Sequence, residues 1–298
     1  MIKVLAYSKF DLAIHIERKK IADGYYPVNY IDCQIDIWDK LTFVFKEKGI
    51  EVVCDDLNLT NDQDNFVFKA AVMFKKIIGG KNLGAKITLE KHIPIKAGFG
   101  GGSSDAAATI LGLSRLWKIK FSEDQIRRLA KTLGKDFYYS LYGKLSEVVG
   151  KGKNYEVVPF SSRLPEFWLL VVVPNAQKPS TGWVYEHLKT KNIGQNFDKQ
   201  SFSANKIGKL KAAISKSDKM GILENLTNDF EDCVSIYYPI VQKIKKDLKR
   251  VGAEASIMAG SGLSVVGFFE SKKQAQDGKQ KLENMQGIKQ IFVSKLIS

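Results

Sequence analysis

The chain has 298 residues, enough for two domains of ordinary size or one large one. Hydrophobic residues make up 44% of it and charged residues 26%, which are ordinary globular values and exclude long disordered segments. Its 46 basic and 32 acidic residues give a net charge of +14. Many of the lysines fall on the polar faces of expected helices, and no basic stripe is interleaved with aromatic residues, so we do not expect nucleic acid as the main partner.

Neither a membrane segment nor a structural metal site is expected. The longest apolar run, residues 167–173, is far shorter than the roughly 18 residues that cross a bilayer. The N-terminal apolar stretch is interrupted by Lys9 and Asp11, which is not typical of a secretory signal. The three cysteines are far apart, and with only three histidines no structural zinc site can be assembled. We therefore expect a protein of the reducing cytoplasm without membrane contact.

The first half of the chain shows strand patterns interrupted by helices. Residues 1–35 alternate apolar and polar side chains around a turn at residues 22–24, which predicts antiparallel strands. Further strands are expected at residues 41–45, 50–54 and 85–93, and helices at residues 65–78, 104–117 and 122–133. Ser122 is the expected N-cap of the last helix, with Gln125 at the capping-box position.

A polar turn at residues 161–165 separates the second half, so we expect domains at residues 1–162 and 163–298. The second half is expected to contain strands at residues 167–173, within 258–269 and at 291–296, and helices at 181–189, 206–215, 238–251 and 272–285. Residues 191–199 are predicted to form a mobile loop. This order of elements predicts an α+β protein whose second half is a small split sandwich with helices on one face of a sheet.

The strongest chemical signal is the glycine-rich segment at residues 94–104, PIKAGFGGGSS. Four glycines within five positions leave backbone N–H groups free to converge on an anion. The alanine-rich helix that follows offers its free N–H groups and positive dipole end to a phosphate. Ser103 and Ser104 add hydroxyl donors, or one of them reaches a phosphate-bound Mg²⁺. A merely flexible loop is the alternative, but the ordered run of strand, proline, glycines, serines and helix favours a phosphate site.

The two commonest phosphate loops do not fit this segment. A Walker A loop requires a lysine and a serine or threonine after the glycines, and no such lysine is present. A dinucleotide fingerprint follows a buried parallel strand, whereas residues 85–93 alternate, as in a sheet with one solvated face.

At these residues the sequence resembles the GHMP superfamily of small-molecule kinases. Their phosphate loop reads roughly P-x-x-x-G-L-G-G-G-S-S-D-A-A, and residues 94–107 match it with Phe99 in place of leucine. Within the superfamily, residues 8–12, Arg18 and residues 23–26 resemble the A-K-I-N-L and R-x-D-G-Y-H patterns of the 4-diphosphocytidyl-2-C-methyl-D-erythritol kinases.

Three further segments resemble that family in order and spacing. The first is residues 134–139, which resemble its G-A-D-V-P-F-F and are followed by matching glycines at Gly143, Gly150 and Gly152. The second is residues 228–231, which resemble its N-D-F/L-E, and the third is residues 258–262, which resemble its M-S-G-(S/T)-G. The resemblance implies the two-domain GHMP fold, with an N-terminal part like domain 2 of ribosomal protein S5 and a ferredoxin-like C-terminal sandwich. It also implies an ATP- and Mg²⁺-dependent kinase of a small-molecule hydroxyl group, a monomer or homodimer.

The resemblance also implies a role for each matched residue. Asp136 would accept the proton of the substrate hydroxyl, and Lys9 would hold the substrate oxygen and the carboxylate through its charge. The residues expected to bind ATP are Pro94, Lys96, Ala97, Gly98, Phe99, Gly100, Gly101, Gly102, Ser103 and Ser104. The residues expected to bind the substrate are Asp11, Tyr25, Tyr26, Thr181 and Tyr185, and no protein side chain is assigned to a metal.

Each of these roles has a plainer alternative. Asp136 can cap the turn after the helix at residues 122–133, and Lys9 can lie on the solvated face of its strand. Tyr25 and Tyr26 can pack on the sheet beside a turn, and residues 260–262 can form a hairpin turn.

Three departures from the family pattern bear on the substrate. Tyr26 replaces a histidine, which exchanges two ring nitrogens for one hydroxyl. Asp11 replaces an asparagine and adds a negative charge near Asp136 and the incoming phosphate. Phe137 and Tyr138 replace Val-Pro. ATP binding is unaffected, but the substrate stays open: a kinase of mevalonate-type, sugar or amino-alcohol substrates, or a non-catalytic nucleotide- or nucleic-acid-binding protein on the same fold, are the alternatives.

Overall fold

The computed structural model describes the whole chain except residues 18, 57–58, 61–63, 153, 189–198 and 298. The strands of the described part are β1 (Ile2–Ile16), β2 (Val28–Lys46), β3 (Ile50–Cys54), β4 (Gly84–Glu90), β5 (Ser146–Lys151), β6 (Asn154–Pro159), β7 (Trp168–Pro174), β8 (Thr227–Asn228), β9 (Ala255–Met258), β10 (Val265–Phe269) and β11 (Ile288–Ile297). Its helices are α1 (Phe66–Ile77), α2 (Gly101–Trp117), α3 (Glu123–Leu133), α4 (Lys135–Tyr142), α5 (Thr181–His187), α6 (Lys199–Ser215), α7 (Lys219–Glu224), α8 (Glu231–Tyr237), α9 (Ile240–Arg250) and α10 (Lys272–Leu282).

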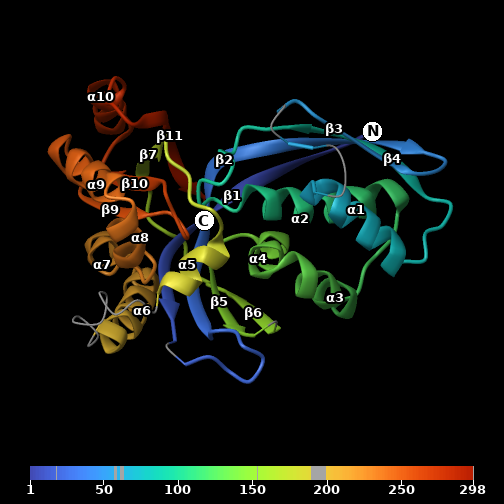
Figure 1. Ribbon diagram of the computed structural model, residues 1–298, viewed down its shortest axis with the longest axis horizontal. Helices are drawn as coiled ribbons and strands as arrows, with labels where there is room; N and C mark the ends of the chain where they lie inside the picture. The colour runs from blue at the N-terminus through green and yellow to red at the C-terminus, as the bar shows by residue number, and fades with distance from the viewer. Residues whose placement is uncertain (18, 57–58, 61–63, 153, 189–198, 298) are drawn as a thin grey trace.

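The N-terminal half is built on the long antiparallel pair of β1 and β2, which runs from the Ile2–Phe43 pair to the Ile16–Val28 pair. Strand β4 pairs with one end of β2 and the β5–β6 hairpin with the other, and β3 runs parallel to β4. Figure 1 shows α1 to α4 on one side of these strands. The pairing of β1 with β2 shifts register on both sides of residues 9–11, and such irregularities re-aim side chains next to functional sites.

The C-terminal half is a four-stranded antiparallel sheet in the order β11-β7-β10-β9. Numbered along the chain, that order is fourth, first, third, second, which is the ferredoxin-like arrangement. Strand β7 is central and buried along almost its whole length, as its unbroken apolar run predicts. Helices α9 and α10 pack against this sheet, and their apolar side chains join its core. The α+β fold expected from the sequence is confirmed.

Two strand pairings and shared hydrophobic clusters join the two halves. Strand β8 runs parallel to β1, with Thr227 opposite Ala13. Strand β11 pairs with β7 and then ends beside β2, where Leu296 is opposite Ile35. Phe10 of β1 contacts Phe268 of β10, with ring centroids 6.0 Å apart, and Phe268 meets Phe167 at 5.5 Å. The division of the chain into domains at residues 1–162 and 163–298 stays a prediction.

Most of the expected elements are present, with shifted ends. The predicted strand at residues 41–45 is the end of β2 rather than a separate element. Helix α2 begins at Gly101, three residues before the predicted start, because the glycines adopt helical geometry despite their low helix propensity. The capping box of Ser122 and Gln125 is present at the start of α3. Eight of the nine residues of the predicted loop 191–199 lie outside the described part, and Lys199 begins α6.

Several short elements were not expected from the sequence. They are the β5–β6 hairpin, α7, α8, β8 and α4. Helix α4 has aromatic residues and a glycine N-cap with φ of 92°, so neither its composition nor its cap is a strong helix signal. None of the helices in the described part has both the length and the apolar character needed to cross a bilayer.

Candidate active site

The glycine-rich segment connects β4 to α2, and its backbone meets that of residues 259–260. Lys96, Gly98 and Gly100 have positive φ values of 56°, 96° and 63°. A Cβ atom at Gly98 would lie 2.2 Å from the carbonyl oxygen of Ala259, and one at Gly260 would lie 2.6 Å from the carbonyl oxygen of Gly98. Glycine is therefore required at both positions because two backbones meet without room for a side chain.

The N-terminus of α2 faces a cavity of about 880 Å³. The helix has 17 residues and begins after Gly100, whose lack of a side chain leaves the first backbone N–H groups without a side-chain cap. These N–H groups and the helix dipole make the end of α2 a favourable place for a phosphate. All ten predicted ATP-binding residues except Ser104 line the cavity: Pro94, Lys96, Ala97, Gly98, Phe99, Gly100, Gly101, Gly102 and Ser103. Ser104 is buried instead, with its hydroxyl 3.3 Å from that of Ser140 on α4.

Lys9 and Asp136 come from β1 and α4 and meet at the wall of the same cavity. The Lys9 ammonium lies 3.8 Å from Asp136 Oδ1, but it donates to both carboxylate oxygens of Asp11 at 2.6 and 2.7 Å. The Asp136 side chain is 32% exposed and that of Lys9 only 5%. Asp11 does not line the cavity; it lies behind Lys9 and holds the ammonium in place, so its predicted contact with substrate is indirect in this arrangement.

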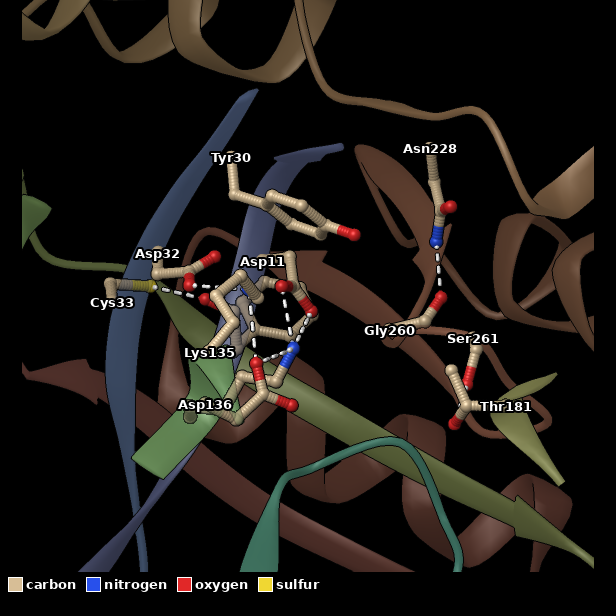
Figure 2. A network of polar contacts seen from close by, with 12 residues as sticks. Asp11, Tyr30, Asp32, Cys33, Lys135, Asp136, Thr181, Asn228, Gly260 and Ser261 are labelled. Atoms are coloured by element: carbon tan, nitrogen blue, oxygen red, sulfur yellow. Dashed lines mark hydrogen bonds and ion pairs between the residues drawn. The ribbon is translucent and has the colours of Figure 1, made fainter. Parts of the chain in front are cut away.

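A second ammonium group, that of Lys135, completes the charged cluster (Figure 2). Its nitrogen lies 3.0 Å from Asp136 Oδ1 and 3.2 Å from Asp32 Oδ2, and 3.5 Å from the ring centroid of Tyr30. We call Lys9, Asp11, Asp32, Lys135 and Asp136 the catalytic cluster. It joins β1, β2 and α4, which are far apart in the sequence.

The charges of the catalytic cluster set the protonation of its members. Burial by itself would raise the pKa of Asp136, but Lys135 and Lys9 hold it well below the usual carboxyl range, so Asp136 is ionised. Burial likewise disfavours the Lys9 ammonium, but Asp11 and Asp136 raise the pKa of Lys9 above its ordinary value. Asp32 lies deepest, and burial raises its pKa to about 8 in spite of Lys135.

The segments at residues 228–231 and 258–262 lie side by side and support the glycine loop. The Asn228 amide donates to the carbonyl oxygens of Met258 and Gly260, both at 2.8 Å, and Glu231 accepts from the Met258 N–H at 2.8 Å. Figure 2 shows Ser261 beside Thr181, with their hydroxyl oxygens 3.1 Å apart. The segment at residues 228–231 thus positions the turn at residues 258–262, whose backbone contacts Gly98.

Aromatic side chains form another part of the cavity wall. The rings of Tyr26 and Tyr185 are nearly parallel, at 9°, with centroids 6.0 Å apart. The hydroxyl of Tyr185 is 3.2 Å from that of Tyr30, and its ring meets the edge of Phe230. Tyr25, Tyr26, Thr181 and Tyr185, four of the five predicted substrate-binding residues, line the cavity.

Lys135 and Lys178 line the cavity and were not singled out from the sequence. Lys135 precedes Asp136, at a position where the family pattern has alanine. A charged residue in place of this small one was the sequence signal that could have identified Lys135. Lys178 lies in the segment between β7 and α5, which carries no motif. Burial and the nearby charge of Lys96 lower its pKa, and two ammonium groups this close favour a polyanion.

A second group of buried charges lies behind the glycine loop, and we call Asp39, Lys91 and Asp105 the support cluster. Lys91 is paired with Asp39 and lies 2.8 Å from Asp105 on α2. Asp39 also accepts from the backbone N–H groups of His92 and Ile93, at 2.5 and 2.8 Å. Burial raises the pKa of Asp105 to about 8 although Lys91 lowers it. The support cluster ties β2, the start of the loop and the first turn of α2 together.

Comparison with known proteins identifies the family. The model of the GHMP kinases N terminal domain matches residues 65–144, and that of the GHMP kinases C terminal domain matches residues 210–287. The chain is 33% identical over 266 residues to the 4-diphosphocytidyl-2-C-methyl-D-erythritol kinases of Bacillus cereus (strain AH187) and Bacillus anthracis (strain CDC 684 / NRRL 3495), covering 89% of this chain and 87% of each relative.

Solved structures show the same fold. The crystal structure of a 4-(cytidine 5'-diphospho)-2C-methyl-D-erythritol kinase has a TM-score of 0.78 at 23% identity, with all of both chains covered. The L. major mevalonate kinase in complex with R-mevalonate has a TM-score of 0.77 at 16% identity, with 99% of this chain and 96% of that one covered. At these identities the structures establish the fold alone. Together with the family models and the Bacillus relatives, they establish that the chain belongs to the GHMP kinases, in the family of the 4-diphosphocytidyl-2-C-methyl-D-erythritol kinases.

Proposed function

We propose that the protein transfers the terminal phosphoryl group of ATP to the 2-hydroxyl of 4-diphosphocytidyl-2-C-methyl-D-erythritol, a step of non-mevalonate isoprenoid precursor synthesis. The observation that carries the proposal is a single cavity lined by the glycine loop, by Lys9 and Asp136, and by the Tyr26–Tyr185 pair. A phosphate-binding loop, an ionised carboxylate with ammonium groups and an aromatic slot are the three features that this reaction needs. We place the ATP-binding domain at residues 1–162 and the C-terminal domain at residues 163–298.

The nucleotide phosphates are expected at the N-terminus of α2. Backbone N–H groups there donate to phosphate oxygens, and Lys96 and Lys178 add positive charge at the cavity wall. Among the described residues no group of three or more acidic, histidine or cysteine side chains forms a metal site by itself. Mg²⁺ is therefore expected to arrive on the nucleotide, with the Ser103 hydroxyl, which lines the cavity, as its protein contact. The ion would supply charge neutralisation on the phosphates.

The chain's own charges suit the transfer step. The substrate hydroxyl oxygen forms a bond to the γ-phosphorus while the bond from that phosphorus to the β–γ bridging oxygen breaks, and the hydroxyl proton passes to Asp136. In a loose transition state the proton leaves late, when the hydroxyl oxygen is already bonding to phosphorus and has become acidic. A carboxylate of low pKa, such as Asp136, is then a sufficient acceptor. Lys9 stabilises the negative charge that develops beside it.

The aromatic slot is proposed to take the cytosine base. Two van der Waals contacts of about 3.5 Å each require rings about 7 Å apart. The Tyr26 and Tyr185 rings are already parallel, and their centroids are 6.0 Å apart. Moving the two rings apart to that separation would let a flat base stack between them. Tyr26 stands where the family pattern has a histidine, so stacking replaces part of the hydrogen bonding expected there.

The substrate is tested by a panel of acceptors, because the fold is nearly as similar to a mevalonate kinase as to the cytidyl enzyme. The protein is incubated with ATP and Mg²⁺ plus the diphosphocytidyl compound, mevalonate, homoserine or galactose. ADP release is measured by a coupled assay, and the product by phosphorus NMR. We expect turnover of the diphosphocytidyl compound at least a hundredfold faster than that of the others. Faster turnover of another alcohol would refute the substrate, and no turnover of any would refute the kinase assignment. RNA binding with a steep salt dependence would then support a binding protein.

A further inference from the structure

Lys135 occupies the place beside the proposed base that Lys9 would otherwise fill. Its nitrogen lies 3.0 Å from Asp136 Oδ1, whereas that of Lys9 lies 3.8 Å from the same atom. Lys9 is drawn away because it donates to both oxygens of Asp11, at 2.6 and 2.7 Å. The ammonium that most closely contacts Asp136 therefore comes from α4 and not from β1.

The number of buried charges makes Lys135 necessary. The catalytic cluster contains three carboxyl groups and two ammonium groups, and the side chains of Lys9, Asp11, Asp32 and Lys135 are at most 12% exposed. Without Lys135, one ammonium would serve three carboxyl groups, and Asp32 would lose its direct ion pair. A buried carboxylate without a counter-charge takes up a proton. Asp136 would lose the nearer of its two ammonium groups, so its pKa would rise towards the form that cannot accept the substrate proton.

The residues at positions 11 and 135 depart from the family pattern together. Asparagine in A-K-I-N-L corresponds to Asp11, and alanine in G-A-D-V-P-F-F corresponds to Lys135. The first change adds a negative charge to the catalytic cluster and the second adds a positive one. Asp11 is among the charges that raise the pKa of Lys135.

We propose that Lys135 is a positioning residue of the transfer site: its ammonium keeps Asp136 ionised and oriented because Asp11 has tied Lys9, so that Asp11 and Lys135 act as a mutually dependent pair. The inference rests on the proposed kinase function, whose failure is recognised separately, since the wild-type protein would then phosphorylate no acceptor.

The first test compares Lys135→Met with wild type, with the diphosphocytidyl compound and ATP as substrates. Methionine keeps most of the side-chain length but removes the charge, and we expect kcat to fall by about 10- to 100-fold. Lys135→Arg, which keeps the charge, is expected to stay within about fivefold of wild type. Lys131→Met is the matched control and should not change kcat, because Lys131 is an exposed lysine four positions earlier, on α3. A kcat of Lys135→Met equal to that of wild type would overturn the proposal.

The second test adds Asp11→Asn, which frees Lys9 to pair with Asp136. We expect Asp11→Asn/Lys135→Met to have a kcat about tenfold higher than Lys135→Met, although it carries one more substitution in the site. Its net charge equals that of wild type, so it is the variant to use if Lys135→Met does not fold. If the fold-loss of kcat in the double variant equals the product of the fold-losses in Asp11→Asn and Lys135→Met, the two residues act independently and the mutual dependence is contradicted.

The pH profile separates positioning of the base from mere support of the fold. Transfer needs ionised Asp136, so kcat falls on the acid side of its pKa, and losing a neighbouring cation moves that acid limb to higher pH. The titratable or charged groups around Asp136 are Lys9 and Asp11 of β1, Tyr30 and Asp32 of β2, Lys135 and Tyr139 of α4, Tyr155 of β6 and Tyr185 of α5.

Of these groups the substitutions at position 135 change only Lys135. We expect the acid limb of Lys135→Met to lie at higher pH than that of wild type. The limb of Asp11→Asn/Lys135→Met should likewise lie at higher pH than that of its parent, which keeps Lys135. In Lys135→Arg the limb should stay in place. Asp11→Asn is the parent of the double variant. A uniform loss of kcat at every pH, with the limb unmoved, would mean that Lys135 only supports the fold.

Discussion

The catalytic cluster and the support cluster contact neighbouring glycines of the same loop, yet they differ in their exposure to the cavity. A Cβ atom at Gly100 would lie 2.7 Å from Cγ of Lys9, and one at Gly101 would lie 3.4 Å from Nζ of Lys91. Each cluster has one carboxyl group more than it has ammonium groups: three to two in the first, two to one in the second. Each therefore contains a carboxyl group whose pKa is raised to about 8, Asp32 in one and Asp105 in the other.

The location of the extra carboxyl group distinguishes the two clusters. In the support cluster all three side chains are at most 6% exposed, and no member lines the cavity. In the catalytic cluster Asp32, whose pKa is raised, is fully buried, while the ionised Asp136 faces the cavity. The same excess of carboxyl groups thus occurs in a closed junction in one place and beside an ionised carboxylate at the cavity in the other. Burial disfavours the charged form of Asp32, whereas the ammonium groups of Lys135 and Lys9 keep Asp136 ionised.

The largest expected effect separates the clusters by activity. Asp136→Asn removes the proposed proton acceptor, and we expect kcat/KM to fall by about 10²- to 10⁴-fold. The thermal midpoint should change little, because Lys135 keeps its partner Asp32. Steady-state kinetics with a parallel thermal melt would measure both quantities. Asp124→Asn, an exposed aspartate in the first turn of α3, is the control. A variant at position 136 with wild-type kcat/KM would show that another group accepts the proton.

The next effect separates the clusters by stability. Lys91→Met leaves Asp39 buried without a counter-charge and removes the ammonium partner of Asp105, so we expect the free energy of unfolding to fall by about 3–5 kcal/mol. Urea denaturation at pH 7 measures it. Lys86→Met on β4, which removes an exposed ion pair with Glu51 of β3, should cost no more than about 1 kcal/mol. Equal losses in the two variants would contradict a structural role for the support cluster.

The smallest effect concerns the pH dependence of stability. The pKa of Asp105 is about 8 in the folded protein, against 3.8 as its ordinary value, so between these values the folded state binds a proton that the unfolded state releases. The corresponding stability is present at acid pH and is lost as the pH rises towards 8. Asparagine cannot titrate, so Asp105→Asn should lose less stability between pH 5 and pH 8, by on the order of 2 kcal/mol.

Urea denaturation at several pH values provides that measurement. Asp124→Asn should keep the wild-type slope, since this carboxyl group is exposed. Identical slopes for Asp105→Asn and wild type would mean that Asp105 is ionised in the folded protein and that the extra proton of the support cluster is held elsewhere.

Local signals accounted for the parts of the protein that were predicted well. The glycine-rich loop, the capping box at Ser122 and strand β1 depend on residues close together in the sequence. All three are present, although α2 begins three residues before its predicted start. Helix α4, which carries Asp136, was missed because it has eight residues, many of them aromatic, and a glycine cap. Ser104 and Asp11 belong to matching motifs, yet neither lines the cavity, because a motif does not determine which way each side chain faces.

The sequence by itself determined the glycine-rich loop, the α+β class and the family resemblance, because each depends on short patterns of residues. Only the tertiary structure decided which charges meet. Lys135 reaches an aspartate 103 positions away on β2, and Asn228 reaches Gly260 across 32 positions. Pairings of this kind follow from strand register and helix packing. The sequence alone raised the problem of an added negative charge at Asp11, and the structure supplied the ammonium group of Lys135 that compensates it.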